Sequence, residues 1–489
     1  MSNSQSQHVD LQAMARQIML ERGFEPDFSS AVQQQLHQIR AQNPVAQVSS
    51  SKAVRDLRGL LWSSIDNDTS RDLDQIEVAE RQPDGAVKVM VGIADVDAFV
   101  SKGSAIDGHA AKQTTSIYTG VRIFPMLPEE LSTDASSLLE TGDRLAMVTE
   151  FVAGSDGTVS GGAVYPAVVR NKAQLTYNAV GAWLEGTSAA PPKVAASSEL
   201  QAQLRLQNDA AQALKKERVE HGALNLDSNE LQPVFVDQQV VDVKNTERNL
   251  ATDLIEDFMI AANGVVARLL LNVSSIRRIV RTPKNWDRIV QLAAAKKFKL
   301  PPDPDSKALN DFLLNQKSAD PDRFADLSLA VIKLIGKGEY VLERPGEPEI
   351  GHFGLAVQDY THSTAPNRRF PDVVTQRLLK AVTAGRPSPY SDSELQAIAS
   401  NCTLKEDAAN KVERDMGKRI AAIAMSGRIG QTFDGIVTGV TEHGTFVRVL
   451  NPRVEGLLDQ AHGLDVGDRL EVKLVRTDVQ RGYIDFVRA

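Results

Sequence analysis

The chain opens with apolar positions at helical spacing. They recur every three or four residues from Leu11 onward, Gly23 and Pro26 interrupt the pattern, and a second such run extends to about Ile39. This spacing predicts two short helices across a tight turn. Residues 1–50 are therefore expected to form a helical segment. It is either a helix-turn-helix that contacts DNA or RNA or a helical hairpin that docks on the rest of the protein.

Residues 51–428 mix strand and helix patterns. Valine and isoleucine alternate with other residues over 76–78 and 87–93, on either side of the turn sequence Pro83-Asp84-Gly85. Alternation with period two around such a turn predicts a β-hairpin. Residues 249–271 have the spacing of a long helix. We expect one α/β (α+β) body over this region.

The pattern of residues 429–489 predicts a separate small barrel. Short apolar runs lie close together with glycine-containing turns between them, which is the pattern of an OB-fold β-barrel. Phe433, His443 and Phe446 either stack nucleic-acid bases on this barrel or fill its core, and the pattern alone does not decide between the two.

Composition limits the class of protein. With 42% hydrophobic and 24% charged residues over 489 positions, the chain is typical of a globular protein of about three domains. It has no secretory signal pattern or membrane-span pattern, and Cys402 is its single cysteine. We expect a cytoplasmic protein with no membrane contact and no disulfide partner. The net charge of −8 argues only weakly against nucleic acid, because a large enzyme can carry a basic groove.

The most informative stretch is acidic. Residues 64–75 hold four aspartates, Asp66, Asp68, Asp72 and Asp74, between an apolar run and a strand pattern. Three interpretations stay open at this point. The stretch is a solvated loop. Alternatively it is a calcium loop, although Arg71 stands where that loop needs glycine. In the third interpretation it holds Mg²⁺ or Mn²⁺ against a phosphate during phosphodiester cleavage.

A second polar stretch and one helix face add candidates. Residues 360–372 form a polar, proline-containing loop in which Arg368 and Arg369 precede a predicted helix, an arrangement that suits phosphate. On the helix 249–271, Glu256 lies on one face with Ile260 and Asn263. Such an acid is either part of an ion pair or faces a ligand.

These motifs resemble those of the RNase II/RNase R family of exoribonucleases, which carry an RNB catalytic domain. The tail is similar to the S1 RNA-binding domain that closes such proteins. The segments that carry the resemblance, in the family's order, are Ile65-Asp66, Asp72-Leu73-Asp74, Ile93-Ala94-Asp95, 124–131, Met259–Asn263 and His352–Leu355.

The resemblance implies processive, metal-dependent hydrolysis of single-stranded RNA from its 3′ end, releasing nucleoside 5′-monophosphates. It implies Mg²⁺, or Mn²⁺, held by Asp66, Asp72, Asp74 and, at the fourth acidic place, Gln75. Asp74 and Asp72 are then catalytic together with Arg368. An amide at Gln75 lacks the negative charge of aspartate, so we expect weaker Mg²⁺ affinity than in a four-aspartate site.

The resemblance also implies RNA-binding roles. Tyr118 matches a tyrosine that stacks on the 3′-terminal nucleotide, and Tyr177 and Glu256 match residues that hold the ribose, where a 2′-OH contact separates RNA from DNA. Arg368 matches an arginine near the scissile phosphate. Leu226 stands where some members have a stacking aromatic residue.

Two departures accompany these matches. The family's Ser-Pro-Ile-Arg is Ala365-Pro366-Asn367-Arg368 here, and only the helical segment 1–50 stands where members usually have two OB domains. We therefore expect RNA capture to rest on the tail barrel. The missing fourth aspartate also allows a different class of function, a catalytically impaired RNA-binding regulator on the same fold. Retention of the three aspartates with Arg368 argues against that alternative.

Overall fold

The computed structural model describes residues 10–42, 45, 53–140, 142–226, 231–236, 239–245, 248–441, 444–459, 461, 463–464 and 466–489. A seven-stranded mixed sheet forms the centre of the body, in the order β1-β8-β7-β4-β3-β2-β9. Its strands are β1 Arg55–Asp56, β2 Ser63–Asp66, β3 Gln75–Arg81, β4 Val87–Ala94, β7 Arg144–Ala153, β8 Val159–Val169 and β9 Ala173–Thr176. The predicted hairpin is confirmed, because β3 and β4 pair antiparallel from Gln75↔Ile93 to Arg81↔Val87.

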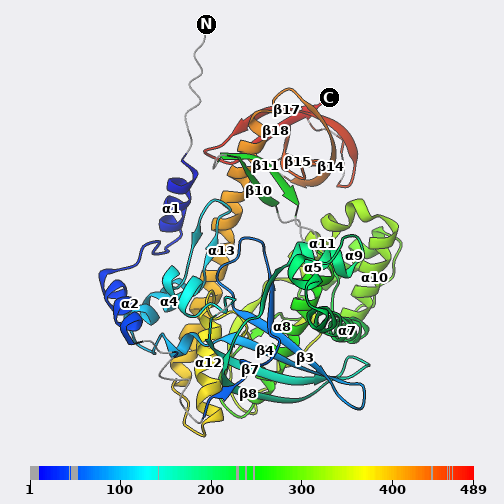
Figure 1. Cartoon of the computed structure of the whole chain (residues 1–489). Coiled ribbons are helices and arrows are strands. Elements are labelled where there is room, and N and C mark those ends of the chain that lie inside the picture. The colour runs from blue at the N-terminus through cyan, green and yellow to red at the C-terminus, as the bar shows by residue number, and fades with distance from the viewer. Residues whose placement is uncertain are drawn as a thin grey trace.

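Helices cover one face of this sheet (Figure 1). They are α4 Ala105–Gln113, α5 Tyr177–Leu184, α6 Pro192–Ala195, α7 Ser198–Glu220, α8 Leu250–Leu269 and α12 Phe370–Thr383. Short helical turns occur at η1 Val96–Ala98, η2 Leu131–Ala135 and η3 Phe353–Leu355. The predicted long helix is confirmed as α8, which begins with a capping box formed by Asn249 and Thr252.

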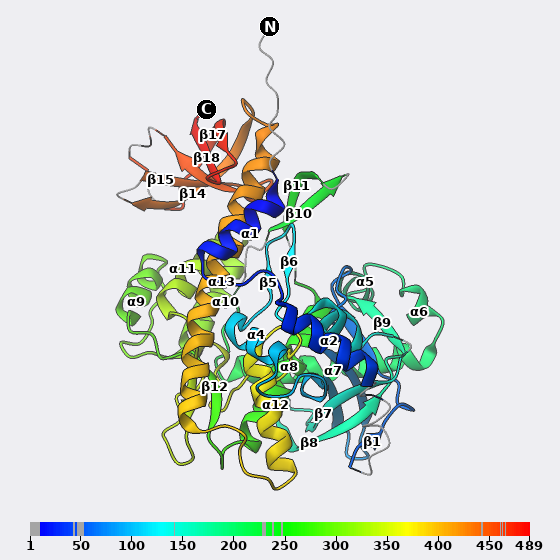
Figure 2. The same cartoon turned by 90° about the vertical axis from the view of Figure 1, so that its left-hand side faces the viewer.

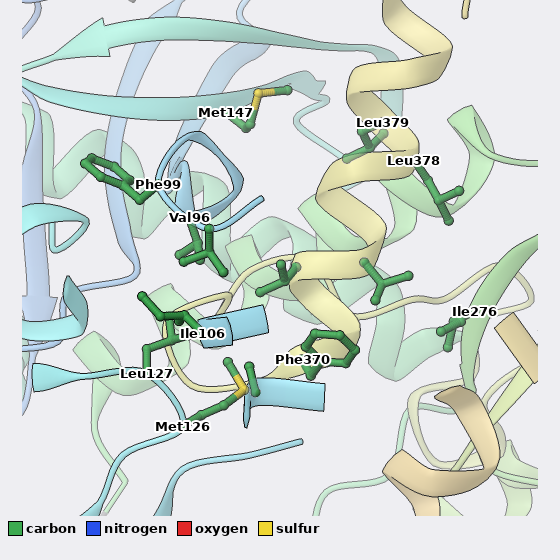
Figure 3. Packing of buried hydrophobic residues seen from close by; sticks show 14 of the residues in the cluster. Val96, Phe99, Ile106, Met126, Leu127, Met147, Ile276, Phe370, Leu378 and Leu379 are labelled. Atoms are coloured by element: carbon green, nitrogen blue, oxygen red, sulfur yellow. The ribbon is translucent and has the colours of Figure 1, made fainter. Parts of the chain in front are cut away.

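The largest apolar cluster lies between α12 and the sheet (Figure 3). Phe370, Leu378 and Leu379 of α12 belong to this cluster, in which Met147 and Val96 lie on one side of the helix and Ile276 on the other. All of these side chains are almost completely buried. Phe370 directly follows Arg369, so the cluster fixes the position of the polar loop 360–372 that carries Arg368 and Arg369, called the arginine loop below.

A helical lobe and one long helix complete the body. The lobe contains α9 Trp286–Ala295, α10 Ser306–Ala319 and α11 Pro321–Ile335. Three small two-stranded sheets lie outside the central sheet. They pair β5 Ile117–Tyr118 with β6 Ile123–Phe124, β10 Leu231–Val236 with β11 Gln239–Asn245, and β12 Ser275–Ile279 with β13 Glu339–Glu343. Helix α13, Asp392–Ser426, rises from the body to the C-terminal barrel (Figures 1 and 2).

The predicted barrel is confirmed. Strands β14 Thr432–Thr441, β15 Gly444–Val449, β16 Glu455–Leu458, β17 Arg469–Asp478 and β18 Tyr483–Arg488 close in the order β14-β15-β16-β18-β17. Its core is continuous with Ile420 and Met425 of α13 and with Val240 and Val243 of β11. The barrel therefore sits on the end of α13 beside the β10–β11 hairpin (Figure 2).

The N-terminal helices dock on different parts of the body. Helix α1, Leu11–Glu21, packs against α13 and the β5–β6 hairpin, whereas α2, Ser30–Gln42, packs into the cluster around α4. Both helices therefore dock on the body, as the second alternative expected, but they do so on separate parts of it rather than as one hairpin. Contact with nucleic acid stays a prediction. Among the described helices, none combines the length and apolar character that crossing a membrane requires. Cys402 is a buried free thiol.

Candidate active site

The acidic segment leaves the sheet at the end of β2 and returns to it at β3. The Oγ of Ser137 accepts from the Leu73 N–H at 2.9 Å, and the Leu73 carbonyl accepts from the Leu138 N–H at 2.9 Å. These bonds fix the aspartates that flank Leu73. The chain continues as strand β3 rather than a helix, so the calcium-loop interpretation is wrong.

Asp74 is held from two directions by the arginine loop. Its side chain is 1% exposed, so it is not part of a solvated loop. Its Oδ1 accepts from the backbone N–H of Asn367 at 2.8 Å, and its Oδ2 accepts from Nε of Arg368 at 3.2 Å. The fold thus joins an aspartate and an arginine that lie almost three hundred positions apart in the sequence.

Asp72 and Asp66 lie on the more open side of the segment. The hydroxyl of Tyr118 donates to Oδ2 of Asp72 at 3.0 Å, and the Tyr118 side chain is 38% exposed. Asp66 uses Oδ1 to accept from the Asn67 N–H at 2.7 Å and from the Ser70 hydroxyl at 2.6 Å. The structure therefore brings the predicted aspartates, Tyr118 and Arg368 together around one segment.

The arginine loop is braced from both ends. Two nitrogens of Arg369 donate to Asp372, at 2.9 and 2.7 Å, and Asp372 also accepts from the Ala365 N–H at 2.8 Å. The carbonyl of Arg368 accepts from the Ser116 N–H at 2.9 Å. Because Ser116 leads directly into β5, this bond couples the position of Arg368 to that of Tyr118.

The acidic groups raise one another's pKa. Burial raises the pKa of Asp74 to about 7, with Asp72 adding to the shift and Arg368 opposing it. Burial likewise raises the pKa of Asp72, and the charge of Asp66 adds to that shift. Partial desolvation opposes the charged form of Arg368, whose side chain is 47% exposed, but the neighbouring carboxylates, Asp74 foremost, outweigh it and raise the pKa of that guanidinium. Arg368 opposes the shift at both Asp72 and Asp74.

Tyr177 lies at the start of α5, and Glu256 lies in the second turn of α8. Tyr177 is the first residue of α5, and its carbonyl accepts from the Asn249 amide at 3.2 Å. Gly181 permits this contact, because a Cβ there would lie 2.3 Å from the Asn249 side chain. Burial raises the pKa of Tyr177, and the charges of Asp66 and Glu256 add to the shift. Glu256 forms an ion pair with Arg248 and is 40% exposed, so the predicted ion pair lies near the surface rather than in the core.

Sequence reasoning missed one acid. Gln75 is buried at the start of β3, and Glu77, two residues further along, is 0% exposed. Among the described residues, neither carboxylate oxygen of Glu77 has a hydrogen-bond partner, and the same holds for the hydroxyl of Ser63. Burial raises the pKa of Glu77 well above its usual value, and the charge of Asp66 raises it further. The available signal was a glutamate between the apolar Ile76 and Val78 of a predicted strand.

The N-terminal helix supports the Tyr118 hairpin. Ala15, Ile18 and Met19 of α1 form one buried cluster with Ile117 and Phe124, the residues that open β5 and close β6. Residues of α13 complete the cluster, and Glu413 of that helix accepts from the Tyr118 N–H at 2.9 Å. The helical segment is thus connected to the site through packing.

The remaining candidates lie away from the aspartates. Phe433 packs edge-on against the buried Phe486 at 6.4 Å between ring centroids, whereas Phe446 is half-buried and outside the barrel cluster. His443 falls outside the described residues. Leu226 packs on the helical lobe of α9, α10 and α11.

The donor chemistry of the acidic segment fits a divalent cation. Carboxylate and amide oxygens are the ligands that Mg²⁺ and Mn²⁺ prefer, and the unpartnered Glu77 adds a further oxygen donor. Within the described part of the chain, no three histidine, cysteine, aspartate or glutamate side chains group as one metal site. A cation here would accordingly draw on fewer carboxylates, with amide oxygen, water or phosphate completing its ligands.

Two family models match the chain. The RNB domain model matches residues 54–385, and the model of the RNase II-type exonuclease C-terminal S1 domain matches residues 431–489. Ribonuclease R of Thermotoga maritima is 32% identical over 474 residues, which cover 88% of this chain and 64% of the relative. The chain thus spans less than two thirds of the length of this relative.

Solved structures show the same fold. Mycoplasma genitalium RNase R in complex with ribose methylated single-stranded RNA superposes with a TM-score of 0.87 at 24% identity, over 98% of this chain and 78% of that one. Yeast Ssd1, described as a pseudonuclease, has a TM-score of 0.69 at 17% identity, over 89% of this chain and 53% of that one. Because the RNB domain model matches well over half of its residues, the chain belongs to the RNB-domain family.

Proposed function

We propose that the protein is a metal-dependent exoribonuclease that hydrolyses single-stranded RNA processively from the 3′ end and releases nucleoside 5′-monophosphates. The observation that carries the proposal is the buried Asp74, held by Arg368 and by the Asn367 N–H, next to an Asp72 that receives the Tyr118 hydroxyl. The relative from Thermotoga maritima is named Ribonuclease R, and the Mycoplasma enzyme binds single-stranded RNA in its structure.

The side chains of the site suggest a division of roles. Arg368 bonds Asp74 through Nε, and its side chain remains 47% exposed, so its outer N–H groups are available to a phosphate oxygen. The exposed ring of Tyr118 offers a surface on which the 3′-terminal base stacks. Tyr177 and Glu256 stand where a ribose 2′-OH is recognised, which would select RNA over DNA.

Mg²⁺, or Mn²⁺, is the proposed cofactor, with Asp66, Asp72, Asp74 and Gln75 as the residues that hold it directly or through water. When bound, such a cation activates water and offsets the negative charge that develops at the phosphate. Asp74 has a second role that does not depend on the cation, because it orients Arg368.

The three regions of the chain take different parts in this proposal. Residues 51–428 carry the chemistry, residues 429–489 capture RNA with Phe446 on the barrel surface, and residues 1–50 brace the Tyr118 hairpin through α1. Arg369 supports the loop through Asp372 and reaches RNA only through its remaining exposed surface. The proposed location is the cytoplasm, where single-stranded RNA substrates are degraded.

The test uses purified protein with Mg²⁺ and a single-stranded RNA labelled at its 5′ end. The expected result is progressive shortening from the 3′ end with release of monophosphates, no action on DNA of the same sequence, and no shortening by the Asp74→Asn variant. Binding without shortening, in Mg²⁺ and in Mn²⁺ alike, would contradict the proposal. That outcome would favour the regulator, and yeast Ssd1, described as a pseudonuclease, shows that this fold also occurs in a protein without nuclease activity.

A further inference from the structure

Glu77 is a buried acid without a protein partner. It lies within β3, is 0% exposed, and pairs across the strands with Ser63, whose hydroxyl is also buried. Neither of its carboxylate oxygens nor the Ser63 hydroxyl has a hydrogen-bond partner among the described residues. A buried carboxylate in this condition is strongly unfavourable unless it gains a proton or a cation.

The bases on the helices that cover this face are already committed to other acids. Lys215 of α7 pairs with Asp253, and Arg218 of α7 pairs with Asp257. Arg248 pairs with Asp253 and Glu256. The other two bases of α7 also contact other groups, because Lys216 pairs with Glu220 and Arg205 lies over the ring of Trp183. None of these printed contacts includes Glu77.

The position of Glu77 connects it to the proposed site. Successive side chains of a strand alternate between faces, so Gln75 and Glu77 project from the same face of β3. Asp66 lies close enough for its charge to act on Glu77, and both act on Tyr177. An uncharged amide therefore stands at residue 75, and an uncompensated acid stands one strand repeat away.

We propose that Glu77 is part of the divalent-cation site and supplies the negative charge that Gln75 lacks. The inference rests on the proposed function, because it assigns a further residue to the same site. Asp66, Gln75 and Glu77 then provide two carboxylates and one amide oxygen. Mg²⁺ is usually held by one or two carboxylates together with substrate phosphate and water, so this set is sufficient. Asp74, whose oxygens are both engaged, remains with Arg368.

The test measures Mn²⁺ binding to the full-length protein without RNA, by calorimetry and by loss of the free Mn²⁺ paramagnetic signal. Glu77→Gln is expected to weaken binding by about 10-fold to 100-fold. Adding Gln75→Asp to that variant moves the acid back by one strand repeat and is expected to restore most of the affinity. The matched control is Glu80→Gln, which removes an exposed acid from the same strand. Unchanged Mn²⁺ affinity in Glu77→Gln would overturn the proposal.

Thermal unfolding gives an independent readout. Without metal, Glu77→Gln replaces a buried acid that has no hydrogen-bond partner by a neutral amide of nearly the same shape, so its melting temperature is expected to rise above that of the unmodified protein. Saturating Mn²⁺ is expected to raise the melting temperature of the unmodified protein more than that of the variant. A variant that melts lower or fails to fold without metal would contradict the proposal, because the charge would then be needed for folding itself.

The two proposals fail in distinguishable ways. If the unmodified protein degrades RNA while Glu77→Gln binds Mn²⁺ normally, the assignment of Glu77 is wrong and the proposed function stands. If Glu77→Gln loses Mn²⁺ affinity but the unmodified protein leaves RNA intact, the cation site stands and the exoribonuclease proposal is wrong.

Discussion

The site has two sides, an arginine side around Asp74 and a strand side around Glu77, and the two acids differ in whether the protein supplies hydrogen-bond partners for them. On the arginine side, both oxygens of Asp74 are bound, by Arg368 and by the Asn367 N–H. On the strand side, the equally buried Glu77 is bound by no described residue. The two acids are three residues apart in the sequence. The difference between them is therefore produced by what the rest of the fold brings to each.

This contrast separates the acid that protein groups already bind from the acid that is expected to bind a cation. The arginine side is complete within the chain, since α12 and its buried cluster hold the loop that reaches Asp74 (Figure 3). The strand side has an excess of negative charge, because Asp66 adds to Glu77 and the nearby bases of α7 are paired elsewhere. A cation is thus expected to act mainly on the strand side.

The largest effect is expected on the arginine side from Asp74→Asn. The variant loses the charge that orients Arg368 and one acid of the segment, so RNA shortening is expected to fall by about 10³-fold or more. The rate of mononucleotide release from single-stranded RNA measures the change. Asp84→Asn, in the exposed hairpin turn, is the matched control. Residual activity within about tenfold of the control would mean that Asp74 is not essential for RNA hydrolysis.

Arg368→Lys tests whether the forked guanidinium matters beyond its charge. Lysine keeps the positive charge, but it cannot bond Asp74 through Nε while offering further N–H groups to phosphate. We expect kcat to fall by about 10²-fold with RNA affinity nearly unchanged. Arg386→Lys, at an exposed position, controls for loss of an arginine. A fall of about 10²-fold in RNA affinity with kcat unchanged would mean that Arg368 only attracts RNA.

The pH dependence of the metal-free protein tests how burial acts on these acids. Burial raises the pKa of Asp74 from 3.8 to about 7, so the unfolded chain releases this proton first as pH rises. The stability linked to Asp74 is complete below about pH 3.8 and is lost as pH rises through about 7. The free energy of unfolding is expected to fall by a few kcal/mol over this range, at roughly 1.4 kcal/mol for each pH unit between the two pKa values.

Denaturant titrations with a chelator present, repeated from pH 4 to pH 8, measure this fall. Asp74→Asn has no titrating group at the position and is expected to show a flatter profile. A variant whose stability declines with pH as steeply as that of the unmodified protein would mean that Asp74 is not the group responsible.

The smallest effect is expected where the two sides meet, at Tyr118. Tyr118→Phe keeps the ring and loses only the hydrogen bond to Asp72, so kcat/KM is expected to fall by about tenfold or less, consistent with about 1 kcal/mol for one such bond. Tyr118→Ala also loses base stacking, which is expected to cost about 1–3 kcal/mol more. If kcat/KM on single-stranded RNA falls equally in the two variants, the hydroxyl accounts for the whole effect and the ring does not stack on a base.

Local sequence patterns predicted the elements that carry the site. The alternation around Pro83-Asp84-Gly85 predicted the β3–β4 hairpin, and helical spacing predicted α8, because both patterns report which face of one element is buried. The meeting of Asp74 with Arg368 is a contact between distant segments. It was expected only from the family's motifs.

The state of Glu77 was not predictable in the same way. Alternation places it on the face of Gln75, but the sequence does not show whether a base from another element reaches it. In the fold, Lys215 and Arg218 reach other acids instead. The support of Tyr118 by α1 was likewise hidden, because the packing of Met19 against Ile117 joins segments that no periodicity relates.

The most direct test of this two-sided site is the position of the cation itself. Crystals of the protein soaked in Mn²⁺ would give an anomalous difference peak at the ion. We predict one peak on the strand side, in contact with a carboxylate oxygen of Glu77 and near Asp66 and Gln75, while Asp74 keeps its bonds to Arg368 and Asn367. A peak out of reach of both carboxylate oxygens of Glu77 would contradict the account.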